Sequence, residues 1–211
     1  MASWIVHLRI ADMLAKRIDV DYEKFLVGNV APDSGVLNEN GLYVPPSSVT
    51  HWTPTERKYG ILTDKFYNKY IQDIKDYKFS FYLGYWSHLI TDLNWVNSIV
   101  TEIKNNMGDK YELPEIKQMV KSEWYVLDMF YLQNHPDFDA FKVLNGINCF
   151  DNVYLDYFTK DNLTNRVKDI CNFYNNNTVS PDREYKYLTM DRVDTFIIDV
   201  VDIILARLDN M

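Results

Sequence analysis

Apolar side chains recur every three or four residues along most of the chain, a period typical of amphipathic helices. Helices are predicted over residues 4–16, 21–27, 60–76, 79–100, 114–121, 123–132, 138–145, 151–174 and 190–208. Asp21 stands where a side-chain N-cap would begin the second of them. No tandem repeat occurs, and no strand-like alternation is long enough to predict a sheet. We therefore expect an all-α protein forming a single domain over residues 1–211.

Two segments lack this periodicity. Residues 27–54 are rich in Gly, Pro, Asn and Ser, and a structureless loop of that length is uncommon in a compact domain unless it has a function. Residues 174–185 are polar and are predicted to connect two helices. The first segment is therefore the place to look for functional side chains.

The most apolar stretch, "YLGYWSHLITDLNW" at residues 82–95, also carries two ionisable groups. A helix that is apolar on nearly every side is a buried helix, and buried ionisable groups must be paired, hydrogen-bonded or bound to metal. His88 and Asp92 are four residues apart, so they share one helix face and can hold one ion. Gly84 lies one turn earlier and lets something approach that face closely. The alternative is a buried His–Asp hydrogen bond beside a packing glycine.

The remaining histidines favour a metal site. His7 lies on the first predicted helix, one turn after Trp4, while His51 closes the irregular segment that also contains Asp33. Imidazole and carboxylate groups are ligands that zinc accepts. A metal that joins Asp33 and His51 to the pair on the apolar helix would keep the long segment ordered. The fourth histidine, His135, precedes a proline and is predicted to lie on the surface without a role.

Composition and charge narrow the function. The chain has 7 Gly against 16 Tyr, 11 Phe and 5 Trp, which favours packed helices over a turn-rich β-fold. A net charge of −8 disfavours binding to nucleic acid or to an anionic membrane by charge alone. It permits a phosphate substrate, because bound divalent cations reverse the local sign. Cys149 and Cys171 lie in stretches predicted to be helical and buried, so reduced core thiols are expected.

The first residues do not have the pattern of a targeting segment. "MASWIVHLRIADMLAKRI" lacks the basic region that begins a signal peptide, and Arg9 interrupts its apolar residues early. No apolar run reaches the roughly 18 residues that a membrane-spanning helix needs. We expect a cytoplasmic protein without a transmembrane segment.

Four separated stretches resemble the bacterial zinc-dependent phospholipase C family, whose all-α fold is shared with single-strand-specific zinc nucleases. They are "SWIVHLRIA", "FLVGNVAPDSG", "PPSSVTHW" and "FYLGYWSHLITDLNW", and they follow one another in the family's order. The resemblance covers roughly residues 3–132 and is specific because four motifs agree. Residues 133–211 add helices without a recognisable motif.

The resemblance implies a set of metal ligands and a reaction. Asp33, His51, His88 and Asp92 match the family's ligands of one metal, and Asp92 also matches a bridge to a second metal that His7 would bind. In the family a water activated by the metals attacks phosphorus, and the carboxylate at the position of Asp33 is a candidate catalytic base. The expected substrate is a small phosphoester or a phospholipid head group, and the expected cofactor is zinc, with other divalent metals possible.

Departures from the family's pattern reduce the expected number of metals. Secreted members begin at the tryptophan that matches Trp4 and use its amino group as a ligand, whereas three residues precede Trp4 here. A further metal in the family uses two histidines and a glutamate, but Ser98, Trp124 and Asp128 fall near those positions. Asp128 keeps a carboxylate and is a candidate ligand. One or two zinc ions are therefore expected.

Three functions remain to be compared. The first is a metal-dependent phosphoesterase of phospholipase C type. The second is a non-catalytic interaction or sensing protein that retains a structural metal, which the missing downstream ligands favour and the retained Asp33 disfavours. An HD-type phosphohydrolase needs adjacent His and Asp, and the sequence contains no such dipeptide.

Overall fold

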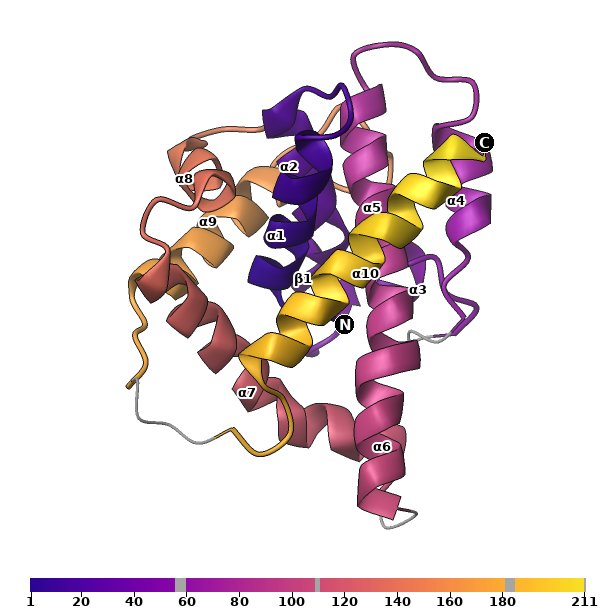
Figure 1. Cartoon of the computed structure of the whole chain (residues 1–211). Helices are drawn as coiled ribbons and strands as arrows, with labels where there is room; N and C mark the ends of the chain where they lie inside the picture. The colour runs from indigo at the N-terminus through magenta and orange to yellow at the C-terminus, as the bar shows by residue number, and fades with distance from the viewer. Residues whose placement is uncertain (56–59, 109–110, 181–184, 211) are drawn as a thin grey trace.

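In the computed structural model a long helix, α5 (Phe79–Trp95), packs against several of the other helices (Figure 1). The structure describes residues 1–55, 60–108, 111–180 and 185–210. Helices α1 (Trp4–Ala15) and α2 (Tyr22–Val30) lie beside α5, and α10 (Met190–Asp209) crosses both α1 and α5. The remaining helices described are α3 (Ser47–Thr50), α4 (Thr63–Tyr70), α6 (Thr101–Met107), α7 (Leu113–Asn134), α8 (Asp139–Gly146) and α9 (Asn162–Asn175).

The predicted fold class is confirmed: the protein is mostly helical, with one very small sheet. Asp21 is the N-cap of α2 as expected, because its carboxylate accepts a hydrogen bond from the backbone N–H of Lys24 at 3.1 Å. Trp95 is fully buried and stands edge-on to Trp124 and Phe196, which joins α5 to α7 and α10. In the part of the chain that the structure describes, no helix is long and apolar enough to cross a membrane.

Three predicted helices have different bounds. The helix predicted over residues 60–76 is wrong in length: α4 ends at Tyr70, because Ile71 departs from helical geometry (φ −122°) and its side chain is buried. The two segments predicted over 114–121 and 123–132 are one continuous helix, α7. Its N-terminus is closed by reciprocal hydrogen bonds between Glu112 and Glu115, so nothing interrupts it before Asn134.

The prediction of a helix over residues 151–174 is wrong in its first half, because α9 begins only at Asn162. The side chain of Asn152 organises the preceding turn. Its amide nitrogen donates to the carbonyls of Leu155 and Phe158, and its oxygen accepts from the N–H groups of Tyr154 and Leu155. Such local hydrogen bonds compete with helix formation.

The apolar helix predicted over residues 79–100 changes geometry before its end. After α5, residues Val96–Val100 form a π-helical turn, η2, which continues directly into α6. The hydroxyl of Thr101 donates to the carbonyl of Val96, five residues earlier, at 2.8 Å. A π-turn adds one residue to a helical turn, so it rotates the following side chains relative to the preceding ones.

The segment 27–54 is more regular than predicted. Helix α2 continues to Val30, and a 3₁₀ turn, η1 (Ala31–Asp33), follows it. A small antiparallel hairpin then joins β1 (Val36–Leu37) to β2 (Tyr43–Val44), which the sequence pattern did not predict. The strands are two residues long, too short for an alternating pattern to be recognised.

The prediction for the cysteines is half right. Both are free, and Cys171 is buried on α9, where burial raises the pKa of its thiol to about 11. Cys149 is exposed in the turn after α8, so the expected burial in a helix is wrong there. Part of the predicted connector 174–185 lies outside the described residues; Asn175 is the last residue of α9.

The closest helix contact in the core depends on two glycines. Helix α2 packs along α5 more extensively than any other pair in the described chain. A Cβ atom on Gly84 would lie 2.1 Å from the carbonyl oxygen of Phe25, and one on Gly28 would lie 2.1 Å from that of Phe81. The close approach that Gly84 permits is therefore that of the α2 backbone.

We predict that Gly84→Ala strongly lowers the midpoint of thermal unfolding. Alanine favours a helix by about 1 kcal/mol relative to glycine, but its methyl group would force α2 and α5 apart. Gly146→Ala is the matched control, because it also lies in a helix and its added Cβ would have no atom within 4 Å outside its chain neighbours and the adjacent backbone of its own helix. Equal unfolding midpoints for the two variants would contradict the prediction.

Candidate metal centre

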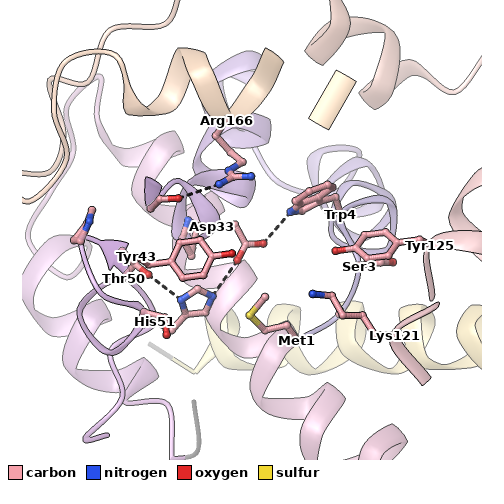
Figure 2. A pocket seen from close by; sticks show the side chains of 15 residues that line it. Met1, Ser3, Trp4, Asp33, Tyr43, Thr50, His51, Lys121, Tyr125 and Arg166 are labelled. Carbon is pink, nitrogen blue, oxygen red and sulfur yellow. Dashed lines mark hydrogen bonds and ion pairs between the residues drawn. The ribbon is translucent and has the colours of Figure 1, made fainter. Parts of the chain in front are cut away.

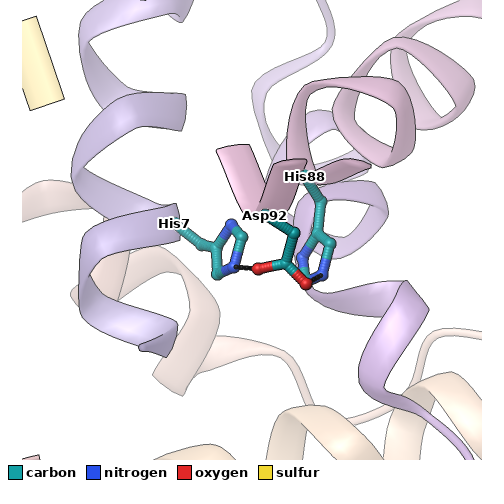
Figure 3. Close-up of side chains that lie close together, drawn as sticks. All are labelled: His7, His88 and Asp92. Carbon is teal, nitrogen blue, oxygen red and sulfur yellow. Dashed lines mark ion pairs between the residues drawn. The ribbon is translucent and has the colours of Figure 1, made fainter. Parts of the chain in front are cut away.

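The first group of candidate ligands joins α1 to α5. His7 comes from α1, and His88 and Asp92 come from α5; all three are buried (Figure 3). Nε2 of His7 lies 3.3 Å from Oδ1 of Asp92, and Nε2 of His88 lies 3.6 Å from Oδ2 of the same carboxylate. The rings of the two histidines stack with their centroids 3.8 Å apart. Within this group Asp92 faces both imidazoles.

The second group joins the irregular segment to α5. Asp33 ends η1, and His51 follows α3 directly, so two short helical turns fix their positions. Nε2 of His51 lies 3.4 Å from Oδ1 of Asp33 and 3.6 Å from Oδ2 of Asp92. One donor atom from each of Asp33, His51 and His88 lies within 4.8 Å of the others, and the same holds for the first group. His88 belongs to both groups.

The spacing of these atoms fits a zinc ion. Zinc ligands lie roughly 2.0–2.1 Å from the ion, so two ligands in a tetrahedral site are about 3.3 Å apart. The four ion-pair distances above, 3.3–3.6 Å, are close to that value. Among the described residues, buried His7 Nδ1, His7 Nε2, His88 Nε2 and Asp92 Oδ2 have no hydrogen-bond partner. Buried polar atoms without partners are costly, and a metal would satisfy them.

Neighbouring groups orient the imidazoles. Nδ1 of His88 lies 2.7 Å from the backbone carbonyl of Asn29, which can only accept a hydrogen bond. In the neutral form of the ring the proton therefore lies on Nδ1, and the lone pair of Nε2 faces Asp92. Nδ1 of His51 contacts the hydroxyl of Thr50 at 2.9 Å, and Tyr85 donates to the backbone carbonyl of Thr50. Each of these two rings thus presents Nε2 to the site.

Burial sets the charges that these groups carry at neutral pH. Burial, together with repulsion from His88, lowers the pKa of His7 to about 4, so its ring is neutral. Burial opposes the ionisation of Asp92, but the amino group of Met1 and the nearby histidines outweigh it and hold its pKa well below the usual range. The site therefore combines a neutral imidazole with a carboxylate, the protonation states that bind metal.

A pocket of about 380 Å³ opens beside the second group (Figure 2). Asp33 and His51 form part of its wall, and the indole N–H of Trp4 donates to Oδ2 of Asp33 at 2.9 Å. Lys121 and Arg166 also line it, so two cationic side chains share the pocket wall with this carboxylate. The two groups of candidate ligands thus differ: the first is buried in the core, and the second reaches a cavity.

Asp128 is not brought into either group. Its buried carboxylate accepts hydrogen bonds from the hydroxyls of Ser3 (2.6 Å) and Tyr174 and from the N–H of Ile5 (3.4 Å). Burial raises its pKa to about 7. Its assignment as a metal ligand stays a prediction. His135, expected at the surface, is exposed.

Sequence reasoning missed the residues that support the ligands. Thr50 precedes His51 directly and could have been considered, but Asn29 acts through its backbone carbonyl, for which no side-chain pattern exists. Lys121 and Arg166 reach the pocket from α7 and α9. Arg166 lies in a part of the sequence without a recognisable motif, so only the fold reveals it.

We predict that the protein binds two zinc ions when it is purified without chelator or histidine tag. The reason is that Oδ1 of Asp92 faces His7 while Oδ2 faces His51 and His88, so this carboxylate can join an ion held with Asp33, His51 and His88 to a second ion held by His7. Structural zinc contributes on the order of 10 kcal/mol to folding in favourable cases, so chelation should lower the melting temperature clearly. His7→Ala should reduce the stoichiometry to one, measured by inductively coupled plasma mass spectrometry. His135→Ala should still bind two zinc ions. An unchanged zinc stoichiometry for His7→Ala would contradict the assignment.

A second prediction concerns the metal-free protein in acid. Unfolded His7 takes up a proton below pH 6.5, whereas folded His7 does so only near its pKa of about 4. As the pH falls through this window, wild type should therefore lose stability relative to His7→Gln, by up to about 3 kcal/mol. Urea unfolding of both proteins between pH 7 and pH 4 measures the difference. The opposite contribution of Asp128, whose pKa is raised, is present in both proteins and cancels. A pH-independent difference would refute the prediction.

Comparison with known proteins agrees with the geometry of the site. The family model described as zinc dependent phospholipase C matches residues 6–206, nearly the whole chain. No curated protein and no solved structure gives a significant match. The buried His and Asp groups are consistent with the zinc that the family's description names. The chain belongs to the zinc-dependent phospholipase C family.

Proposed function

We propose that this protein is a zinc-dependent phosphodiesterase that removes the phosphorylated head group of a phospholipid. The observation that carries the proposal is that Asp33 and His51 belong both to a candidate ligand group and to the wall of a cavity of about 380 Å³. Catalytic metal sites keep a position open to substrate, whereas structural sites are closed by protein ligands. A cavity of that volume suits a head group.

Two sets of side chains would hold the metal. His7, His88 and Asp92 form the buried set, and Asp33, His51 and His88 form the set at the pocket. When bound, zinc supplies Lewis-acid stabilisation of phosphoryl oxygens and makes water more acidic. Asn29 and Thr50 keep the imidazoles turned toward the site through the contacts at Nδ1.

Asp33 is the group placed to move a proton. Trp4 holds Oδ2 of this carboxylate through its indole N–H, which fixes the carboxylate plane at the pocket wall. We assign Asp33 to accept the proton of the attacking water as the water oxygen forms a bond to phosphorus. The bond from phosphorus to the glycerol oxygen then breaks, and the proton passes to that oxygen. The products are a phosphomonoester and diacylglycerol.

The pocket supplies charge and apolar surface for such a substrate. Lys121 and Arg166 line it and offset the negative charge of a phosphate group, although the chain as a whole carries a charge of −8. The guanidinium of Arg166 donates to the carbonyl of Gly35 at 3.1 Å, which positions it over the pocket. Trp4 and Tyr125 contribute aromatic walls. A small phosphoester therefore fits this site better than a long polyanion such as nucleic acid.

The second candidate is an interaction or sensing protein that keeps a structural metal. Three positions near those of the family's further metal favour it, because their side chains are engaged elsewhere. Ser98 donates to the carbonyl of Asn94, Trp124 packs against Trp95, and Asp128 bonds to Ser3 and Tyr174. The experiment below separates the two functions.

We predict metal-dependent hydrolysis of p-nitrophenyl phosphocholine and of short-chain phosphatidylcholine at neutral pH. Asp33→Asn should lower kcat by about 100-fold or more, because it weakens a ligand and removes the base. A small head-group diester should be a better substrate than single-stranded DNA. Release of nitrophenol and of phosphomonoester measures the rates.

His135→Ala is the control, since His135 is exposed and its ring contacts the carbonyl and the ring of Tyr131 on α7, away from the candidate ligands. Its rate should equal that of wild type. If zinc-loaded protein hydrolyses neither phospholipid, nucleotide nor generic diester, the structural role of the metal replaces the proposal.

A further inference from the structure

The exposed apolar side chains of this protein are concentrated beside the pocket. Large hydrophobic residues that are at least one-third exposed are otherwise scattered singly over the described chain. In the hairpin segment, residues 34–50, six of them occur together: Val36, Leu37, Leu42, Tyr43, Val44 and Val49. Those on the two strands and the turn are 50–65% exposed. Contiguous exposed apolar surface of this kind marks an interaction site.

The base of the hairpin is fixed, although its tip projects. The amide of Asn162 donates to the carbonyl of Ser34 at 3.1 Å, and Arg166 donates to that of Gly35 at the same distance, so α9 holds the first strand. A Cβ on Gly35 would lie 2.9 Å from the carbonyl oxygen of Pro45, so the two sides of the base are in close contact. The tip is closed by Asn38, whose side-chain oxygen accepts from the N–H groups of Asn40 and Leu42. Val36 pairs with Val44 on one face of the hairpin, and Leu37 pairs with Tyr43 on the other. Both faces therefore carry exposed apolar side chains.

The hairpin is continuous with the candidate site. Gly35, Tyr43 and Pro45 line the pocket, and the segment that forms the hairpin connects the candidate ligands Asp33 and His51 along the chain. Figure 2 shows Tyr43 beside the carboxylate of Asp33. A surface that covers the hairpin therefore meets the mouth of the pocket.

The charge of the hairpin indicates which kind of partner surface it would bind. Glu39 is the single charged residue in the sequence from 34 to 50, and the chain carries −8 overall, so an anionic partner is disfavoured. Apolar side chains with few charges enter the boundary between head groups and acyl chains. We propose that residues 36–44 dock the protein on the surface of a zwitterionic phospholipid bilayer and place the pocket over a head group. The inference rests on the proposed function for its substrate.

Flotation with vesicles tests the docking without turnover. The probe is a vesicle made of a non-hydrolysable phosphonate analogue of phosphatidylcholine, mixed with zinc-loaded protein. Wild type should float with the vesicles. Leu37→Glu and Leu42→Glu should each lower the vesicle partition coefficient about tenfold or more. The reason is that each replaces an apolar side chain that would move from water into the bilayer interface with a charged one. Neither residue lines the pocket.

Ile198→Glu is the matched control: Ile198 is 53% exposed, like the hairpin residues, but lies on α10. It should float as wild type does. Failure of wild type to float, or equal losses in the control, overturns the proposal. So does a wild-type dimer in analytical ultracentrifugation that the hairpin variants convert to a monomer, if vesicles bind neither form.

A soluble diester separates this inference from the proposed function. All three variants should hydrolyse p-nitrophenyl phosphocholine at the wild-type rate, whereas the two hairpin variants should be slower on phosphatidylcholine vesicles. If no protein hydrolyses the soluble diester, the proposed function fails and flotation still decides the docking. If the hairpin variants also lose activity on the soluble diester, they alter the pocket and the docking assignment is rejected.

Discussion

The close contact between α2 and α5 is the constraint on which the candidate site depends. Gly28 and Gly84 let each backbone approach the other to a distance that no side chain would permit. At that distance the carbonyl of Asn29 reaches Nδ1 of His88, and the amide of Asn29 donates to the carbonyl of Gly84 at 3.2 Å. Because η1 follows α2 directly, the same contact brings η1, and with it Asp33, against α5. The packing of α2 against α5 therefore also fixes the positions of the candidate ligands.

Asp92 connects the two halves of the centre. One carboxylate oxygen faces His7 on α1, and the other faces His51 and His88. The N–H of Ala2 also donates to the first oxygen at 2.9 Å. A carboxylate with so many partners can be ionised in the core despite its burial. The candidate metal centre thus joins α1, α5 and the segment around His51 at a single acidic group.

The sequence predicted the fold class and the side chains of the site because both depend on local or motif-level signals. The i,i+4 pair His88 and Asp92 is visible in any helical pattern, and Asp33 and His51 stand out in a segment without periodicity. What could not be predicted depends on contacts distant in sequence. The turn around Asn152 replaced half of a predicted helix through its own side-chain bonds, and Arg166 reaches the pocket only because α9 packs beside η1.

The protonation states of these side chains determine how many protons the site releases when a metal binds. Most metal sites release protons when the ion enters, since thiols or imidazolium groups must first ionise. Here the ring of His7 is neutral, so one of its nitrogens carries no proton and can bind the metal directly. Nδ1 of His88 faces the carbonyl of Asn29, away from the site. Asp92 is already a carboxylate. Metal entering this buried group at neutral pH displaces no proton from His7 or Asp92, so these residues contribute nothing to a buffer-dependent heat of binding.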